Sequence, residues 1–281
     1  MIETLRALAV LLEPPGPEHA AIARALELPA VAGPDEHTAM LVFQAYPYAS
    51  VYLGAEGMLG GEARDRVAGF WRALGGEPPP EPDHLSILLA GLAALAGEAP
   101  TVRAALFWEH VASWMPPYLA TVLRIGGRFH AGWAELAGRV VAELAEELGP
   151  PVRLPLALRS APELPVEPAG IEELLTLLLV PARTGVVLVR DDLERAAMEL
   201  DLALRVAERK FALRALLAQS PAAVLDWLAR EARAQAESLL PLEPVTAWWA
   251  ARARSTASWL DALSATARAD RSTAERDLAA R

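Results

Sequence analysis

The sequence has no cysteine and a single lysine, Lys210, among its 281 residues. Without cysteine the chain forms no disulfide bond and offers no thiolate ligand to a metal ion. The lack of cysteine also fits a reducing compartment, and we expect a cytoplasmic protein. Aromatic residues make up only 6% of the chain, and runs of β-branched residues are scarce. Because strands favour these two residue types, the composition argues against a sheet-based fold.

A long hydrophobic run is missing as well. The most apolar stretch, residues 174–189, is interrupted by Pro181 and Arg183, whereas a membrane-spanning helix needs about 20 apolar residues. The first residues contain Glu3 and only a short apolar run, so they do not match a secretory signal. We therefore expect a soluble protein with no membrane insertion.

Positive charge is also in short supply, since 26 basic residues face 36 acidic ones and give a net charge of −10. A general nucleic-acid binder needs a basic face, so this class of partner is excluded. The acidic balance permits a basic partner. Salt screens such an attraction over about 10 Å, so it steers the partner more than it anchors it.

The sequence is rich in helix-forming residues. Hydrophobic residues make up 53% of the chain, and Ala, Leu, Glu and Arg dominate, all of which lose little side-chain freedom in a helix. Apolar residues recur three and four positions apart. The pattern predicts an all-α fold, with helices over residues 62–74, 84–96, 102–115 and 129–148. Glycines are placed to end two of these helices, at Gly75 and Gly149, and Pro116 with Pro117 must stop or kink the third.

The chain changes character after residue 150. Residues 150–170 are rich in proline and lack a helical period, which indicates a linker or an extended strap. We predict a helical domain over 1–155, a linker over 156–170, a C-terminal helical extension over 171–245 and a polar tail over 246–281 that is helical or disordered. Since a long strap permits exchange between subunits, a monomer and a domain-swapped homodimer both stay open.

The segment from Tyr46 to Pro117 places tyrosines, tryptophans and histidines in otherwise apolar helical sequence. Aromatic rings with polar tips suit a groove that grips an apolar peptide and fixes its ends by hydrogen bonds. In the step EPDHL, Asp83 is expected to cap the following helix through backbone N–H groups. Alternatively, Asp83 and His84 are polar contacts at the mouth of a pocket.

His110 lies one turn before Trp114, so the two side chains share a helical face. Two interpretations stay open: a half-buried core histidine packed on an aromatic neighbour, or a contact for a ligand. The histidines as a set are scattered, without an HExxH or other paired spacing (His19, His37, His84, His110 and His130). A zinc site needs three or four ligands at defined spacing, so no metal or other cofactor is expected.

Signatures of common enzyme classes are missing. The sequence has no GxSxG nucleophile elbow, no GxxxxGK[ST] phosphate loop and no Rossmann glycine fingerprint. Carboxylate pairs such as Glu146–Glu147 fall on predicted surface positions. A binding protein is therefore expected in place of an enzyme.

The order of motifs supports a more specific interpretation. The succession YASVYLG, LGGEARDRVAGFWRALG, EPDHL and FWEHVASWMPPY resembles the TorD/DmsD/NarJ-type chaperones, which serve molybdenum oxidoreductases of the dimethyl-sulfoxide-reductase type. The resemblance covers about residues 41–148. The C-terminal block is similar to an extension found in some members of this family.

The resemblance implies a TorD-like helical bundle with an additional C-terminal helical block. It also implies binding of the twin-arginine leader of an apo-molybdoenzyme catalytic subunit until the molybdopterin cofactor is inserted. At the matching positions, Asp83 and His84 lie beside the leader-binding pocket. The other residues implied in peptide binding line or support that pocket: Tyr48, Tyr52, Trp71, His110 and Trp114.

In one position the chain departs from many relatives. Where they carry an acidic residue one turn after the histidine, this sequence has Ile87, Leu88 and Leu89. The departure points to a different client or a more apolar groove. Two alternatives to a chaperone stay open: a metal- or small-molecule-dependent helical enzyme that uses Asp83, His84 and His110, and a structural scaffold for a folded partner.

Overall fold

The computed structural model describes residues 1–205 and 207–279. Within these residues every regular element is a helix, which confirms the predicted all-α class. The elements run α1 Ile2–Val10, α2 His19–Ala25, α3 Pro34–Leu41, α4 Ala49–Leu53, α5 Gly61–Ala73, α6 Leu85–Ala94, the 3-10 turn η1 Leu95–Gly97, α7 Pro100–Ala105, the π-helix η2 Leu106–Ala112, α8 Met115–Ile125, α9 Arg128–Leu148, α10 Leu156–Arg159, α11 Ile171–Leu178, α12 Pro181–Thr184, α13 Arg190–Glu199, α14 Arg209–Gln219, α15 Pro221–Ser238 and α16 Val245–Ala279.

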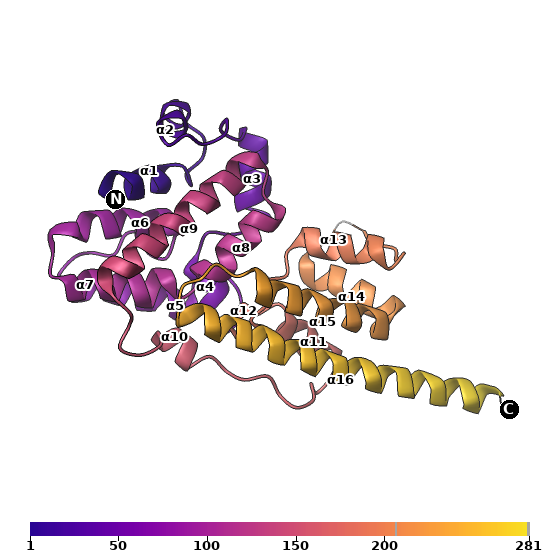
Figure 1. Cartoon of the computed structure of the whole chain (residues 1–281). Helices are drawn as coiled ribbons and strands as arrows, with labels where there is room; N and C mark the ends of the chain where they lie inside the picture. Colours follow the sequence, from indigo (N-terminus) through magenta and orange to yellow (C-terminus); the bar gives the residue numbers. More distant parts are fainter. Residues whose placement is uncertain (206, 280–281) are drawn as a thin grey trace.

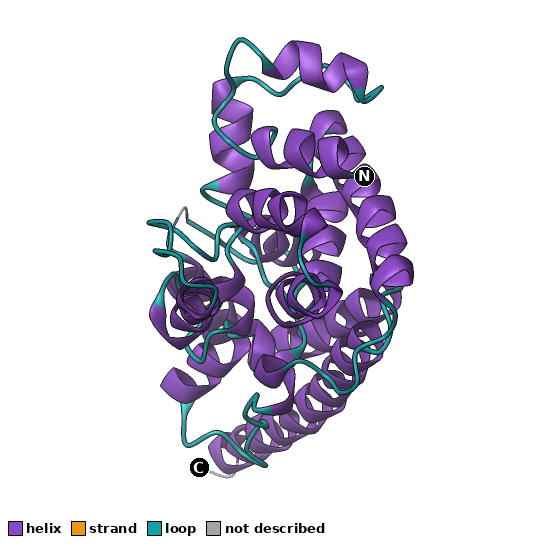
Figure 2. Cartoon of the chain, turned by 90° about the vertical axis from the view of Figure 1, so that its left-hand side faces the viewer, coloured by secondary structure: helices purple, strands orange, loops and turns teal. Residues whose placement is uncertain are grey.

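Helices α1 to α9 form one end of the molecule, and α11 to α16 form the other (Figure 1). At the first end α1 packs on α6 and α9, and α8 packs on α9. At the second end α15 lies beside α16, and the C-terminal end of α16 projects beyond it (Figure 1). Figure 2 shows the helices in purple, joined by loops and without a strand in the described residues.

Buried hydrophobic side chains form two clusters. The predicted linker does not separate them, because the first cluster contains residues from both sides of it. The second cluster is built from residues of α11 to α16 and their connections. The first belongs mainly to α1 to α9, but Val187, Val189, Val245 and Trp249 also enter it. Elements beyond the linker therefore complete the core of the first part, and the predicted domain boundaries stay a prediction.

Two predicted helix ends are confirmed by their backbone geometry. Gly75, which follows α5, and Gly149, which follows α9, have φ angles of +80° and +72°. A glycine tolerates these angles because it has no Cβ.

The predicted helix over residues 102–115 is wrong at its C-terminal end: α7 and the π-helix η2 run on without a break, but only as far as Ala112. The π-helix ends at Ala112, and α8 begins at Met115 with Pro116 and Pro117 in its first turn. Prolines are accepted there because the first N–H groups of a helix have no partner within the helix. The polar tail is helical through Ala279 in α16, and the last two residues of that predicted segment lie outside the described ones.

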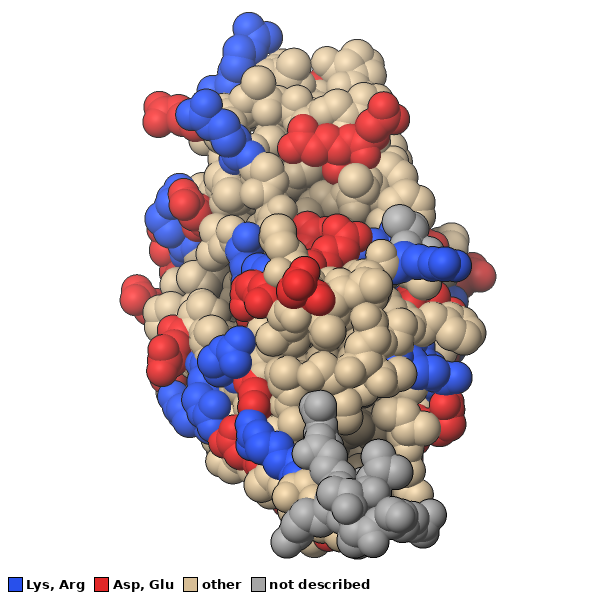
Figure 3. Space-filling view, turned by 90° about the vertical axis from the view of Figure 1, so that its right-hand side faces the viewer, with Lys and Arg blue, Asp and Glu red and all other residues tan. Residues whose placement is uncertain are grey.

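Charged side chains of both signs are interspersed on the face shown in Figure 3, with a broad uncharged area between them. Neither sign of charge covers that face continuously. Among the helices that the structure describes, none combines the length and the apolar content needed to cross a bilayer.

Candidate functional site

The loop that carries the EPDHL step pairs with the segment before α4. Tyr48 and His84 form an isolated antiparallel bridge, flanked by backbone hydrogen bonds of 2.8 and 3.0 Å. Their rings meet edge to face, with centroids 4.6 Å apart. The bridge therefore fixes a tyrosine and a histidine from distant parts of the sequence side by side.

Two carboxylates complete this cluster, which we call the acidic corner: Glu13, Tyr48, Glu81 and His84. The Tyr48 hydroxyl donates a hydrogen bond to Glu81 at 2.8 Å. Glu13, just after α1, lies 3.9 Å from Nδ1 of His84, and its side chain is 52% exposed. The hydroxyl of Ser86 also donates to Glu13. Three segments of the chain thus bring carboxylates and rings to one place at the surface.

The charge of the acidic corner is negative near neutral pH. Burial, the hydrogen bond to Glu81 and the nearby carboxylates together raise the pKa of Tyr48, so its hydroxyl stays protonated. Burial lowers the pKa of His84 although Glu13, Glu81 and Asp83 oppose that shift. A neutral histidine leaves the carboxylates uncompensated. The acidic corner is therefore suited to a cationic group such as a guanidinium.

Asp83 does not cap the helix that follows it, so that prediction is wrong. Since α6 begins at Leu85, the capping position belongs to His84, whose side chain accepts from the N–H of Ser86. Asp83 is buried, with 1% of its surface exposed. Its carboxylate accepts from the N–H of Ser50, in the first turn of α4, at 3.1 Å. Asp83 thus caps a different helix and ties the loop to α4.

Tyr52 and Trp114 lie in the core. They are 1% and 0% exposed, and their rings stack with centroids 5.1 Å apart. Tyr118 contacts both rings, and the Trp114 indole N–H donates to the His110 carbonyl at 2.8 Å. In this conformation neither side chain reaches a ligand directly. Their predicted part in peptide binding stays a prediction. From these positions the two rings could act only by supporting the residues that line a binding surface.

The rings of Trp71 and His110 both contact Phe70. The Trp71 indole covers Gly91 of α6 so closely that a Cβ there would lie 2.9 Å from the ring. The buried Nε1 of Trp71 has no hydrogen-bond partner among the described residues. His110 meets the Phe70 ring edge to face at 5.4 Å. Only Tyr48 and His84, of the predicted residues, are thus brought together at an exposed carboxylate cluster.

His110 also lines a cavity between α5 and the segment after α9, together with Arg66, Glu109 and Arg153. Burial, with a smaller contribution from Arg66, lowers the pKa of His110 to about 4. The imidazole is therefore neutral at physiological pH. This environment agrees with the interpretation of a half-buried core histidine.

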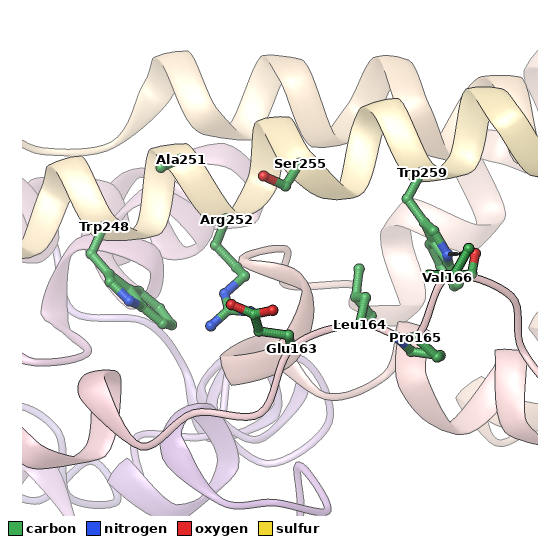
Figure 4. A pocket seen from close by; sticks show the side chains of 9 residues that line it. All are labelled: Glu163, Leu164, Pro165, Val166, Trp248, Ala251, Arg252, Ser255 and Trp259. Carbon is green, nitrogen blue, oxygen red and sulfur yellow. Dashed lines mark hydrogen bonds between the residues drawn. The ribbon is translucent and has the colours of Figure 1, made fainter.

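The strap between α10 and α11 runs along α16 and forms a further pocket with it (Figure 4). Arg252 donates to the carbonyls of Pro162 and Ala161 at 3.2 and 3.4 Å, and the Trp259 indole donates to Val166 at 3.2 Å. The polar groups of α16 are thus used to hold the strap against its own chain. The first residues of the predicted linker form α10, and residues 160–170 run on to α11 without a helix. The linker as a domain boundary and an exchange between subunits stay predictions.

Glu13 and Glu81 were not among the predicted site residues. Glu81 belongs to the EPDHL step, so a local motif points to it, whereas Glu13 carries no local signal. No three histidine, aspartate or glutamate side chains in the described part of the chain are grouped so that they could hold a metal ion. Asp83, His84 and His110, on which the enzyme alternative depends, therefore do not form a metal-binding group in the described part of the chain.

Residues 40–120 match the family model described as nitrate reductase delta subunit. No curated protein and no solved structure matches the chain. The matched range contains the bridge between Tyr48 and His84, the buried Asp83 and the π-helix with His110. This match supports the resemblance of residues 40–120 to the nitrate reductase delta subunit family, the helical NarJ/TorD-type maturation chaperones.

Proposed function

We propose that this protein is a cytoplasmic chaperone for a molybdenum oxidoreductase of the dimethyl-sulfoxide-reductase type. It binds the twin-arginine leader and the apo form of the catalytic subunit, and it assists molybdopterin insertion before export or assembly. The match of residues 40–120 to the model of a family that matures molybdoenzymes supports the kind of partner. The finer steps of leader recognition and cofactor insertion are our proposal.

The acidic corner is the observation that carries this proposal. A guanidinium pairs with a carboxylate through two parallel hydrogen bonds and stacks on aromatic faces. Glu13 offers a half-exposed carboxylate, and Tyr48 lies beside it on the bridge with His84. The bridge and the buried Asp83 hold these groups in place before a peptide arrives, so little ordering is required of the protein.

An apolar segment follows the arginines in a twin-arginine leader, and its burial supplies most of the binding free energy. Burial of about 400 Å² at about 25 cal/mol per Å² gives about 10 kcal/mol before losses. Ordering a flexible peptide removes several kcal/mol of this amount. We therefore expect a dissociation constant in the micromolar range or somewhat below.

Calorimetric titration with twin-arginine leader peptides tests the proposal. The Glu13→Gln and Glu81→Gln variants should each weaken binding by roughly twofold to fivefold, as expected for partly exposed ion pairs. Glu135→Gln serves as the matched control, because Glu135 is an exposed carboxylate on α9, outside the acidic corner. A peptide with both arginines replaced by glutamine should bind the wild type and the two corner variants with the same affinity. Unchanged affinity in both corner variants would refute the assignment of this site.

A further inference from the structure

A second surface lies where the segments around α3 and α4 meet α13 and α14. It is a groove of about 320 Å³ lined by Phe43, Met58, Leu59, Arg190, Glu208 and Arg209. The three apolar side chains are 51%, 65% and 56% exposed. Large apolar residues exposed together in one concavity are typical of an interaction site. We call this surface the arginine-rimmed groove.

The walls of the arginine-rimmed groove are fixed by contacts between distant parts of the chain. Gly57 has a φ of +61° and lies so close to α11 that a Cβ would be 2.5 Å from the Leu179 carbonyl. On the other side, the N–H of Asp191 donates to the Gln44 amide oxygen at 3.3 Å, and the Gln44 amide donates to the Asp191 carboxylate. The groove is therefore formed before a partner binds.

The charges on the rim favour an acidic partner. Neither Arg190 nor Arg209 forms an ion pair with a carboxylate in the described part of the chain; Arg209 donates to the Leu188 carbonyl at 2.9 Å, and the buried Nε of Arg190 has no partner. An adjoining cavity shares Arg190 and adds Arg205 with Glu194. Helices α13 and α14 also begin at this rim, with their positive dipole ends. This part of an acidic protein thus carries unpaired positive charge.

We propose that the arginine-rimmed groove docks an acidic amphipathic helix of the client apoprotein. The apolar face of that helix packs on Phe43, Met58 and Leu59, and its flanking carboxylates pair with Arg190 and Arg209. The basic leader is disfavoured here by like charge and belongs at the acidic corner. The inference rests on the proposed function for the identity of the partner, whereas the chemistry of the bound helix follows from the groove itself.

Fluorescence anisotropy with a labelled model peptide tests this site. The probe is a helical peptide of about 18 residues with leucines three and four positions apart and glutamates between them. The full-length protein should bind it, and an otherwise identical peptide with lysines should bind at least tenfold more weakly at low salt. Equal or tighter binding of the lysine peptide would overturn the proposal.

Two variants assign the binding to the groove. Arg190→Gln combined with Arg209→Gln should weaken binding of the glutamate peptide roughly fivefold to thirtyfold, and Phe43→Asp should weaken it without altering the arginines. Arg139→Gln is the control, because Arg139 is exposed on α9 outside the groove. Circular dichroism must show each variant folded, and Phe43→Asp remains a test if the double variant unfolds. Unchanged binding in a folded groove variant would refute the site.

Competition with a twin-arginine leader peptide separates this inference from the proposed function. Saturating leader should leave the glutamate peptide bound, and the Glu13→Gln variant should bind the glutamate peptide normally. Displacement by the leader would refute two separate sites. If the wild-type protein binds no leader peptide but still binds the glutamate peptide, the proposed function alone is refuted. Association of the protein with itself, lost in Phe43→Asp, would instead assign the groove to a second copy.

Discussion

Asp83 and His84 are neighbours in the same loop, but their surroundings give them different roles. The Asp83 carboxylate is buried on the N–H of Ser50, whereas His84 forms part of the acidic corner beside Glu13 and Tyr48. A buried acceptor with a backbone donor supports the fold, and a partly exposed imidazole is available to a ligand. The two residues should therefore respond differently to substitution.

Substitution of Asp83 by alanine should destabilise the protein by about 1–3 kcal/mol, because it leaves the N–H of Ser50 without a partner. The free energy of unfolding from urea denaturation measures this loss. Glu81→Ala is the matched control, since its carboxylate is exposed and, among the described residues, accepts from the Tyr48 hydroxyl alone. An Asp83→Ala protein of unchanged stability that loses leader binding would show that Asp83 acts on the ligand instead.

Stability should fall with pH below about 6.5, in part because of His110. Its pKa is lowered from 6.5 to about 4 by burial and by Arg66. Between these two pKa values His110 is protonated in the unfolded chain and neutral in the folded chain. The free energy of unfolding therefore decreases as the pH falls. The loss from this residue approaches about 3 kcal/mol near pH 4.

The His110→Leu variant should show a smaller slope of unfolding free energy against pH in this range. Urea denaturation at several pH values measures it. Some slope should remain, because burial also lowers the pKa of His37, His84 and His130. A slope identical to that of the wild type would contradict the buried, neutral state of His110.

At the scale of elements, the strap is held to α16 by few hydrogen bonds. The Trp259 indole donates to Val166, and Glu163 and Glu167 flank that contact in sequence. Loss of one hydrogen bond worth about 1 kcal/mol raises local opening about fivefold. Trp259→Phe keeps a ring and removes the donor, so a glutamate-specific protease should cut this variant's strap correspondingly faster. Ser258→Ala, a neighbouring exposed position, should leave the rate unchanged.

Local signals predicted many helices but not all of their ends. Gly75 and Gly149 were recognised because left-handed backbone after a helix favours glycine. The π-helix over Leu106–Ala112 was not, since its register depends on how its large side chains pack in the core. The polar composition of the tail left a helix and disorder both open as predictions. In the structure the N-terminal half of α16 buries one face against α15, with residues such as Ala253 and Leu260.

The candidate site was predictable only in part for a related reason. Tyr48 and His84 are in recognisable motifs, whereas Glu13 reaches them through the packing of α1 on α6. Tyr52 and Trp114 were expected near a peptide because tyrosine and tryptophan have polar tips. The fold satisfies the Trp114 N–H internally, at the His110 carbonyl, and places both rings in the core. Residue type alone does not distinguish these outcomes.

At the scale of the whole molecule, buried charges join the two ends. Arg124 of α8 pairs with the carboxylate of Asp192 in α13 and lies 3.7 Å from Glu231 of α15. Arg195 completes the network with contacts to both acids at 3.1 and 2.7 Å. Burial raises the pKa of Asp192, although Arg124 opposes this shift. A charge as buried as that of Asp192, 1% exposed, needs its partners to stay ionised.

A double-mutant cycle on this network tests whether the two ends are energetically coupled. Asp192→Leu should cost about 3–5 kcal/mol, because Arg124 and Arg195 lose a buried partner. Arg124→Leu alone should also destabilise the protein. The double variant should lose clearly less stability than the two single variants together, with an interaction energy of about 1–3 kcal/mol.

Unfolding followed by tryptophan fluorescence and circular dichroism should give coincident transitions in the wild type, since Trp249 of α16 lies in the core built by α1 to α9. Additive effects together with separate transitions would show that the C-terminal helices fold independently of the first part.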